Sequence, residues 1–89
     1  MKYSVLYSTL ANYQLTDIWL RAKDKRKVTD AVNALEKRLR YDAHQLGVLD
    51  PDGRRVLVAV PLAITFDVIP DDCNVVILSM RYNTSPGKS

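Results

Sequence analysis

The chain has 89 residues, the size of one domain, and a polypeptide this short buries only about 60% of its unfolded surface. A hydrophobic content of 47% and a net charge of +3 are ordinary for a globular protein, and this charge permits an anionic partner without requiring one. The single cysteine excludes an internal disulfide and therefore a disulfide-stapled secreted scaffold. No stretch approaches the roughly 18 apolar residues of a membrane span, and the N-terminus lacks a signal-peptide core, so we expect a cytoplasmic protein without a membrane partner.

The first expected elements are a strand and a helix. Polar and apolar side chains alternate over residues 3–8, which is the period of a β-strand. Ser8 and Thr9 can then cap a helix, because their hydroxyl groups accept hydrogen bonds from the first free amides. From Leu10 onward the apolar residues recur at helical spacing. The stripe that they form comprises Ala11, Leu15, Ile18, Trp19 and Ala22.

A second helix follows after a very short join. Asp24 can cap it, Glu36 and Arg40 form a favourable pair on its exposed face, and it should fade over residues 41–43. Its apolar face comprises Val28, Ala31, Val32, Leu35 and Leu39. Two amphipathic helices joined this closely predict a helical hairpin.

The remaining residues predict strands joined by turns. A loop over residues 44–55 contains the turn sequence "DPDG", in which proline and glycine each favour the required backbone angles. Because Pro61 lacks an amide hydrogen, it should lie at a turn or an edge. The expected segments are strands at 54–60, 62–69 and 75–82, a turn at 70–74 and a loose tail at 83–89.

This order predicts an α+β fold with two layers, strand–helix–helix–strand–strand–strand. The helical hairpin should pack on one face of a four-stranded, mainly antiparallel sheet, within a single domain at residues 1–82. The first strand must join at an edge or beside the last strand. The other sheet face stays at least partly open, which favours a protein partner, since exposed apolar surface needs covering.

The residue types that usually hold metals or act as nucleophiles are scarce. His44 and Cys73 alone do not make a metal site, which needs three or four ligands. Cys73 follows Asp71 and Asp72, whose negative charge disfavours a reactive thiolate. No glycine-rich phosphate loop is present, so we expect neither a metal nor another cofactor.

Basic residues are the remaining candidates for a site. One cluster surrounds the helix–helix join and another lies late in the second helix, and both are also typical of a solvated helix surface. Their members are Arg21, Lys23, Lys25, Arg26 and Lys27, and Lys37, Arg38 and Arg40. Arg54 and Arg55 should point to opposite sheet faces and bind a nucleic acid or protein partner. Arg81 and Tyr82 end the last strand, where a guanidinium can hold a phosphate and a tyrosine can stack on a base or donate a proton.

The stretches "YSVLYS", "RRVLVAVPLAITFDV" and "NVVILSMRY", with "IW" in the first helix, together resemble the RelE/ParE superfamily of bacterial type II toxins. The resemblance covers about residues 2–82. It implies a growth-arresting toxin neutralised by a cognate antitoxin, in a toxin–antitoxin hetero-oligomer or as a homodimer. RelE-like members cut mRNA on the ribosome without a metal, whereas ParE-like members poison DNA gyrase.

The resemblance transfers poorly to individual nuclease residues. Ala63 stands where the nuclease branch has an arginine, and Val56 stands where a second basic residue is usual after Arg54. Arg81 and Tyr82 fit loosely as catalytic residues. The sequence therefore leaves three roles open: ribosome-dependent mRNA cleavage, gyrase poisoning, and a non-enzymatic binding module with a toxin fold.

Overall fold

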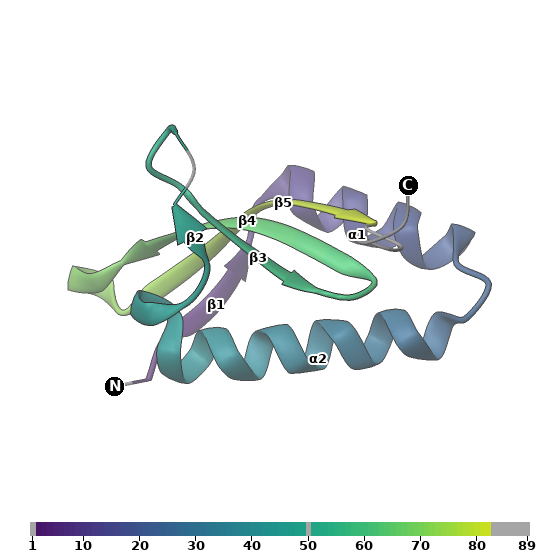
Figure 1. Cartoon of the computed structure of the whole chain (residues 1–89), viewed down its shortest axis with the longest axis horizontal. Helices are drawn as coiled ribbons and strands as arrows, with labels where there is room; N and C mark the ends of the chain where they lie inside the picture. The colour runs from purple at the N-terminus through teal and green to yellow at the C-terminus, as the bar shows by residue number, and fades with distance from the viewer. Residues whose placement is uncertain (1, 50, 83–89) are drawn as a thin grey trace.

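The computed structural model describes residues 2–49 and 51–82, and the predicted tail at 83–89 lies outside them. Two helices and five strands follow one another along the chain (Figure 1). Their bounds are β1 Ser4–Tyr7, α1 Thr9–Arg21, α2 Lys25–Asp42, β2 Val48–Leu49, β3 Arg55–Ala59, β4 Leu62–Ile69 and β5 Asn74–Tyr82. Single 3₁₀ turns at Ala43–Gln45 and Pro70–Asp72 precede β2 and β5. Within the described residues, neither helix is both long and apolar enough to cross a membrane.

The strands form one mixed sheet in the order β1-β5-β4-β3-β2. β3, β4 and β5 pair antiparallel with one another in sequence order, as the sequence predicted. β1 pairs parallel to β5, so the first strand lies both at an edge and beside the last strand. The expected count of four strands was wrong, because β2 lies within the predicted loop at 44–55 and pairs with β3.

β2 escaped the sequence analysis because two residues cannot show an alternating pattern. Gly47 makes the pairing possible. Its φ is +79°, and an added Cβ would lie 2.8 Å from the carbonyl oxygen of Val56 on β3. Only glycine accepts both this backbone conformation and this close approach.

Both helices begin at the caps that the sequence predicted. The Ser8 hydroxyl accepts a hydrogen bond from the amide of Ala11 at 2.9 Å and donates one to the Leu78 carbonyl at 2.8 Å. One side chain therefore starts α1 and fastens it to β5. At α2, the Asp24 carboxylate accepts a hydrogen bond from the Lys27 amide at 3.2 Å. The helix ends at Asp42, inside the predicted stretch at 41–43.

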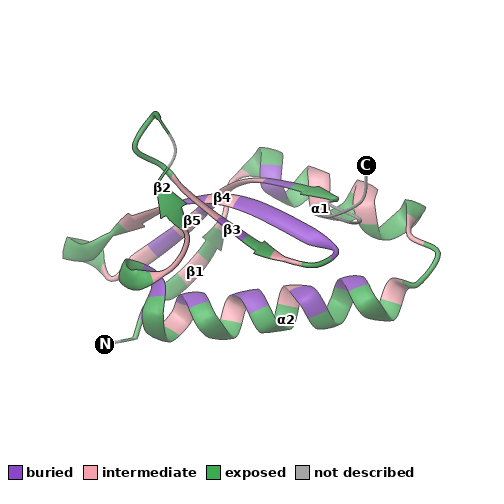
Figure 2. Ribbon diagram, in the orientation of Figure 1, coloured by how far each residue is buried: buried purple, intermediate pink, exposed green. Residues whose placement is uncertain are grey.

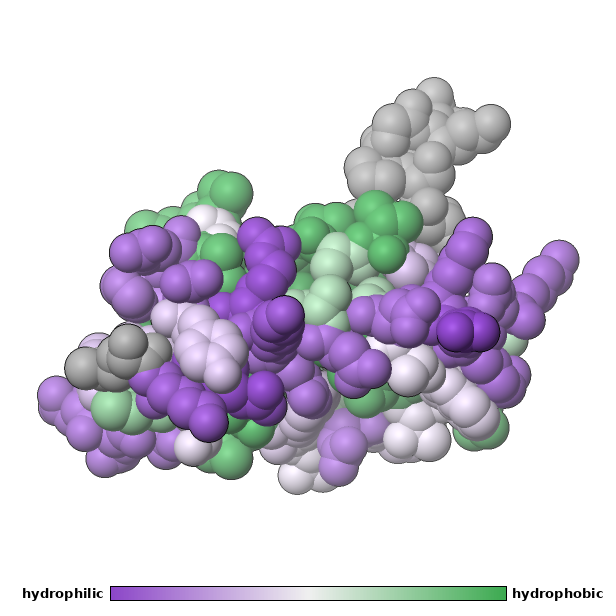
Figure 3. All heavy atoms as spheres, turned by 90° about the horizontal axis from the view of Figure 1, so that it is seen from below, coloured by the Kyte–Doolittle hydropathy of each residue, from purple (hydrophilic) through white to green (hydrophobic). Residues whose placement is uncertain are grey.

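The helices pack on one face of the sheet, which confirms the predicted two-layer α+β fold. Burial follows one side of α2 and alternates along β1 and the first part of β5, whereas Leu62, Ala63 and Ile64 of β4 are all buried (Figure 2). The largest fully buried side chains are Phe66, Leu35, Leu39, Leu62, Ile64, Ile77, Val28 and Val75. On the opposite sheet face, Leu6 is 46% exposed and Val58 is 42% exposed. The outer side of the molecule near α2 is mostly hydrophilic, with hydrophobic side chains gathered in separate patches (Figure 3).

A β-bulge in β5 changes which residues face the helices. Thr65 pairs with Ser79 and Phe66 pairs with Ile77, so Leu78 has no partner on β4. The extra residue shifts the alternation by one position. Met80 is consequently buried against the helices, like Ile77 three positions earlier.

A tyrosine–carboxylate hydrogen bond joins the two layers at the edge of the sheet. The Tyr7 hydroxyl on β1 donates to the Glu36 carboxylate on α2. Burial, the hydrogen bond and the negative charge of Glu36 all raise the pKa of Tyr7 far above its usual value of 10. The neutral phenol is therefore the form that the folded protein holds.

We predict that the Tyr7–Glu36 hydrogen bond stabilises the folded protein up to about pH 10 and that this stabilisation declines at higher pH. The unfolded chain releases the Tyr7 proton near pH 10, whereas the folded protein retains it, so the free energy of unfolding falls as the pH rises toward the higher, folded-state pKa. Tyr7→Phe should lower that free energy by about 1 kcal/mol at pH 7. The difference in the free energy of unfolding between Tyr7→Phe and the unmodified protein should shrink above pH 10. Urea denaturation at pH 7 and at a pH above 10 would measure it. Tyr41→Phe, at an exposed position, is the control, and a deficit that stays constant with pH would contradict the prediction.

Candidate functional site

A groove separates α1 from the end of β5, and we call it the α1–β5 groove. Its volume is about 670 Å³, within the roughly 300–1,000 Å³ of typical ligand sites. The lining residues are Tyr13, Gln14, Asp17, Ile18, Arg21, Ala22, Lys23, Met80, Arg81 and Tyr82. Its floor is apolar, its two tyrosines are exposed, and its rim is basic.

The groove exists because β1 is shorter than β5. β1 pairs only with residues 74–77, and the chain then turns at Ser8 into α1. Beyond Ile77, that edge of β5 faces a helix instead of a strand. The Gln14 side-chain oxygen accepts a hydrogen bond from the Met80 amide at 2.7 Å, which satisfies one donor of the exposed edge.

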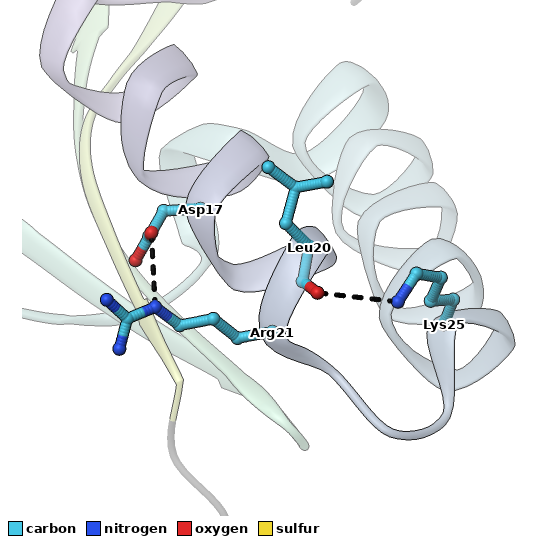
Figure 4. Close-up of polar contacts among 4 residues, drawn as sticks. All are labelled: Asp17, Leu20, Arg21 and Lys25. Atoms are coloured by element: carbon cyan, nitrogen blue, oxygen red, sulfur yellow. Dashed lines mark hydrogen bonds and ion pairs between the residues drawn. The ribbon is translucent and has the colours of Figure 1, made fainter.

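Charged side chains of α1 line one wall of the groove. The Asp17 carboxylate accepts a hydrogen bond from Nε of Arg21 at 3.2 Å, one turn along the helix (Figure 4). Only this nitrogen of the Arg21 guanidinium contacts Asp17 in that ion pair, so the terminal nitrogens can serve a ligand. With Lys23 and Arg81, the rim carries three cationic groups against one carboxylate.

Lys25 belongs to the same basic cluster in the sequence but has a structural role. Its ammonium group donates to the carbonyl oxygens of Leu20 at 3.5 Å and Ala22 at 3.1 Å (Figure 4). It also lies 5.0 Å from the ring centroid of Trp19. Lys25 therefore closes the C-terminal end of α1, where a cation is favoured by the helix dipole.

The structure brings two of the predicted site residues, Arg81 and Tyr82, together with Arg21 and Lys23 from the helix–helix join. Tyr82, 47% exposed, also lines a second groove of about 510 Å³ between α2 and the β3–β4 turn. The sequence analysis missed Tyr13, which lies on the exposed side of α1, and Gln14, a polar residue at the spacing of the apolar stripe, three residues after Ala11 and four before Ile18. The one available signal was Tyr13 itself, an aromatic residue on the polar side of an amphipathic helix and 72% exposed.

Arg54 and Arg55 lie away from this groove. Arg55 pairs with Phe66 on β4, whereas Arg81 pairs with Ala63, three residues nearer the β3–β4 turn. The Arg55 guanidinium donates to the Leu46 carbonyl oxygen at 3.1 Å. It therefore fastens the segment before β2 to β3, in addition to any contact with a partner that the sequence predicts.

The open sheet face beside Arg81 is apolar where the family resemblance implies charge. Ala63 is fully buried and lies in register between Val58 and Arg81. Val56 pairs with Thr65, two residues along each strand from the Val58–Ala63 pair and on the same sheet face. Neither position offers a cation for a phosphate.

His44 and Cys73, the two residues first considered for metal or nucleophile chemistry, lie in the 3₁₀ turn before β2 and directly after the 3₁₀ turn before β5. The His44 ring is 6.2 Å from the ring of Tyr3, and Cys73 has a left-handed φ of 52° after the turn that precedes β5. Over residues 2–49 and 51–82, no three or more His, Cys, Asp or Glu side chains gather as metal ligands would.

Comparison with known proteins gives a match in structure alone. No protein-family model and no curated protein sequence matches the chain. A chain of the toxin–antitoxin complex RelBE2 from Mycobacterium tuberculosis superposes with a TM-score of 0.76 at 14% identity, over 96% of this chain and 95% of that one. A chain of the chromosomal ParDE toxin–antitoxin system from P. aeruginosa gives 0.65 at 19% identity, over 94% and 98%. The protein thus shares its fold with chains of these two toxin–antitoxin assemblies, as the sequence resemblance implied.

We predict that Gln14→Ala frees the Met80 amide while leaving the fold intact. The loss of one partly buried hydrogen bond should lower the free energy of unfolding by about 1 kcal/mol. Hydrogen exchange at the Met80 amide should accelerate more than at the Val75 amide in the paired part of β5. Asn12→Ala, at an exposed position on α1, is the control, and equal exchange rates in both variants would contradict the role given to Gln14.

Proposed function

We propose that this protein is the toxin-type component of a type II toxin–antitoxin pair and that a cognate antitoxin neutralises it. The support is a fold shared over nearly the whole chain with chains of two toxin–antitoxin assemblies. The partly open sheet face, with Leu6 and Val58 exposed, supports a protein partner on physical grounds.

We further propose that the toxin acts by binding a protein target, of which DNA gyrase is the example that ParE-type toxins provide. The observation that carries this choice is the burial of Ala63 between Val58 and Arg81. Alanine cannot neutralise the charge that builds up on a phosphate during cleavage. A single missing donor of this kind commonly lowers the rate about 10²- to 10³-fold.

Ribosome-dependent mRNA cleavage is the second candidate. It is favoured by the meeting of Arg81 and Tyr82 with Arg21 and Lys23 around one groove. In this mechanism Arg81 would hold the scissile phosphate and Tyr82 would transfer a proton. The ribose 2′-hydroxyl would be the nucleophile, so no metal is required.

Inducible expression in a bacterium tests the proposal. We expect growth to stop on induction and to resume when the neighbouring reading frame is expressed with it. Messages should stay intact by primer extension, while purified protein should inhibit gyrase supercoiling in vitro. Cuts at codon boundaries would favour the nuclease instead. Normal growth despite soluble expression would leave the fold as a binding module without toxicity.

Two substitutions separate the candidates at the level of residues. If the protein cleaves mRNA, Arg81→Ala should reduce cleavage about 10²-fold or more and Tyr82→Phe should shift its pH dependence. If it binds a protein target, both variants should leave messages intact and alter only the concentration needed to arrest growth. Arg38→Ala, an exposed charge on α2, is the control for both readouts.

A further inference from the structure

A second stripe of side chains runs along α1, on the side of the helix that faces solvent. Its members are Leu10, Tyr13, Asp17 and Leu20, which are spaced by three, four and three residues. Leu10, Tyr13 and Leu20 are each more than half exposed, whereas Ala11 on the core side of the helix is fully buried. We call these four residues the outer stripe of α1. An alternation of three and four residues is the spacing at which one helix packs along another.

The outer stripe is complementary to itself in its positions. Leu10 and Leu20 lie five positions on either side of Leu15, and Tyr13 and Asp17 lie two positions on either side of it. Two copies of α1 that crossed antiparallel at Leu15 would therefore bring Leu10 opposite Leu20 of the second copy. The same two-fold axis would bring Tyr13 opposite Asp17, and each pair would occur twice.

The facing groups also match in their chemistry. Leucine opposite leucine buries apolar surface that is exposed in the single chain. The Tyr13 hydroxyl can donate a hydrogen bond to the Asp17 carboxylate, which Arg21 contacts through Oδ1 at 3.2 Å. A carboxylate accepts several hydrogen bonds on its two oxygens, so Asp17 can keep Arg21 and accept the tyrosine as well. Antiparallel helices also set opposite ends of their dipoles side by side, which is favourable.

We infer that the outer stripe of α1 is a self-association surface, on which a second copy of this chain docks antiparallel about a two-fold axis at Leu15. α1 has 13 residues, so the contact strip is about 20 Å long and about 10 Å wide. This footprint is smaller than the roughly 800 Å² that each partner buries in a stable complex. We therefore expect a weak dimer, with a dissociation constant on the order of 100 μM. The inference uses only the surface of α1 and does not depend on the proposed function.

Sedimentation equilibrium of the purified full chain tests the inference between about 1 μM and about 1 mM. We expect a monomer at the lowest concentration and mostly dimer at the highest. Leu20→Glu should raise the dissociation constant at least about tenfold, because the two-fold axis places the new carboxylate in the interface twice. Val48→Glu, the same change at an exposed position on β2, should leave it unchanged. A monomer at every concentration, or equal association by Leu20→Glu, would overturn the inference.

The polar pair has a test of its own. Tyr13→Phe keeps the ring but removes the hydroxyl, and the symmetry of the dimer makes this a loss of two hydrogen bonds. The dissociation constant should rise roughly tenfold. Tyr41→Phe, at an exposed position on α2, is the matched control and should have no effect. Association that is unchanged in Tyr13→Phe would contradict the pairing with Asp17.

Disulfide cross-linking tests the antiparallel arrangement. Leu10→Cys and Leu20→Cys are made separately, each together with Cys73→Ser, which removes the one native thiol. Ten residues of helix rise about 15 Å, so neither variant alone can bring its own two thiols within bonding reach in the dimer. An equal mixture of the two should give a cross-linked dimer under mild oxidation. Cross-linking of either variant with itself as readily as in the mixture would overturn the arrangement.

Other occupants of the outer stripe would give other patterns. A chain that stays monomeric, in which Leu20→Glu weakens only the capture of the protein encoded by the neighbouring reading frame, would overturn the inference and assign the stripe to a heterologous interface. Self-association that is lost in Val48→Glu and kept in Leu20→Glu would also overturn it, and would place the contact at the β2 edge of the sheet.

Discussion

The position of β5 between β1 and β4 is the constraint on which the rest of this structure depends. β5 contributes Val75, Ile77 and Met80 to the core, and it is the strand against which α1 packs. Ser8 fixes that packing, since its hydroxyl caps α1 and also bonds the Leu78 carbonyl. Because β1 ends where α1 begins, the length of β1 decides how much of β5 is left to face the helix.

The grouping of charge at the helix–helix join follows from this arrangement. α1 runs beside the uncovered part of β5, so its C-terminal residues approach the C-terminal residues of the sheet. Arg21 and Lys23 thereby meet Arg81, although some 60 residues separate them in the sequence. The result is a basic rim around an apolar floor. A mild overall charge of +3 gives no hint of such a local concentration.

Much of the fold could be predicted because the pattern and the packing agree. The change of period at Leu10, the caps Ser8 and Asp24 and the meander of the last three strands are all local features, and all are present. β2 could not be predicted, because it depends on a close approach between Gly47 and Val56 across a turn. The site was predicted in part, since Arg81 and Tyr82 belong to the groove, but Tyr13 and Gln14 join it only through the packing of α1 on β5.

The bulge at Leu78 shows how strand length controls orientation. Without it, strict alternation from Ile77 would turn Met80 outward and Arg81 toward the helices, exchanging an apolar and a charged group across the sheet. The apolar residues Val75, Ile77 and Met80 show this shift in the sequence itself, because the first two are two positions apart and the last two are three positions apart. A chain that lacked Leu78 would present the same side chains to each face without a bulge, because Met80 would then stand two positions after Ile77. The extra residue and the bulge therefore compensate each other, and the side chains at this end of the sheet depend on the two together.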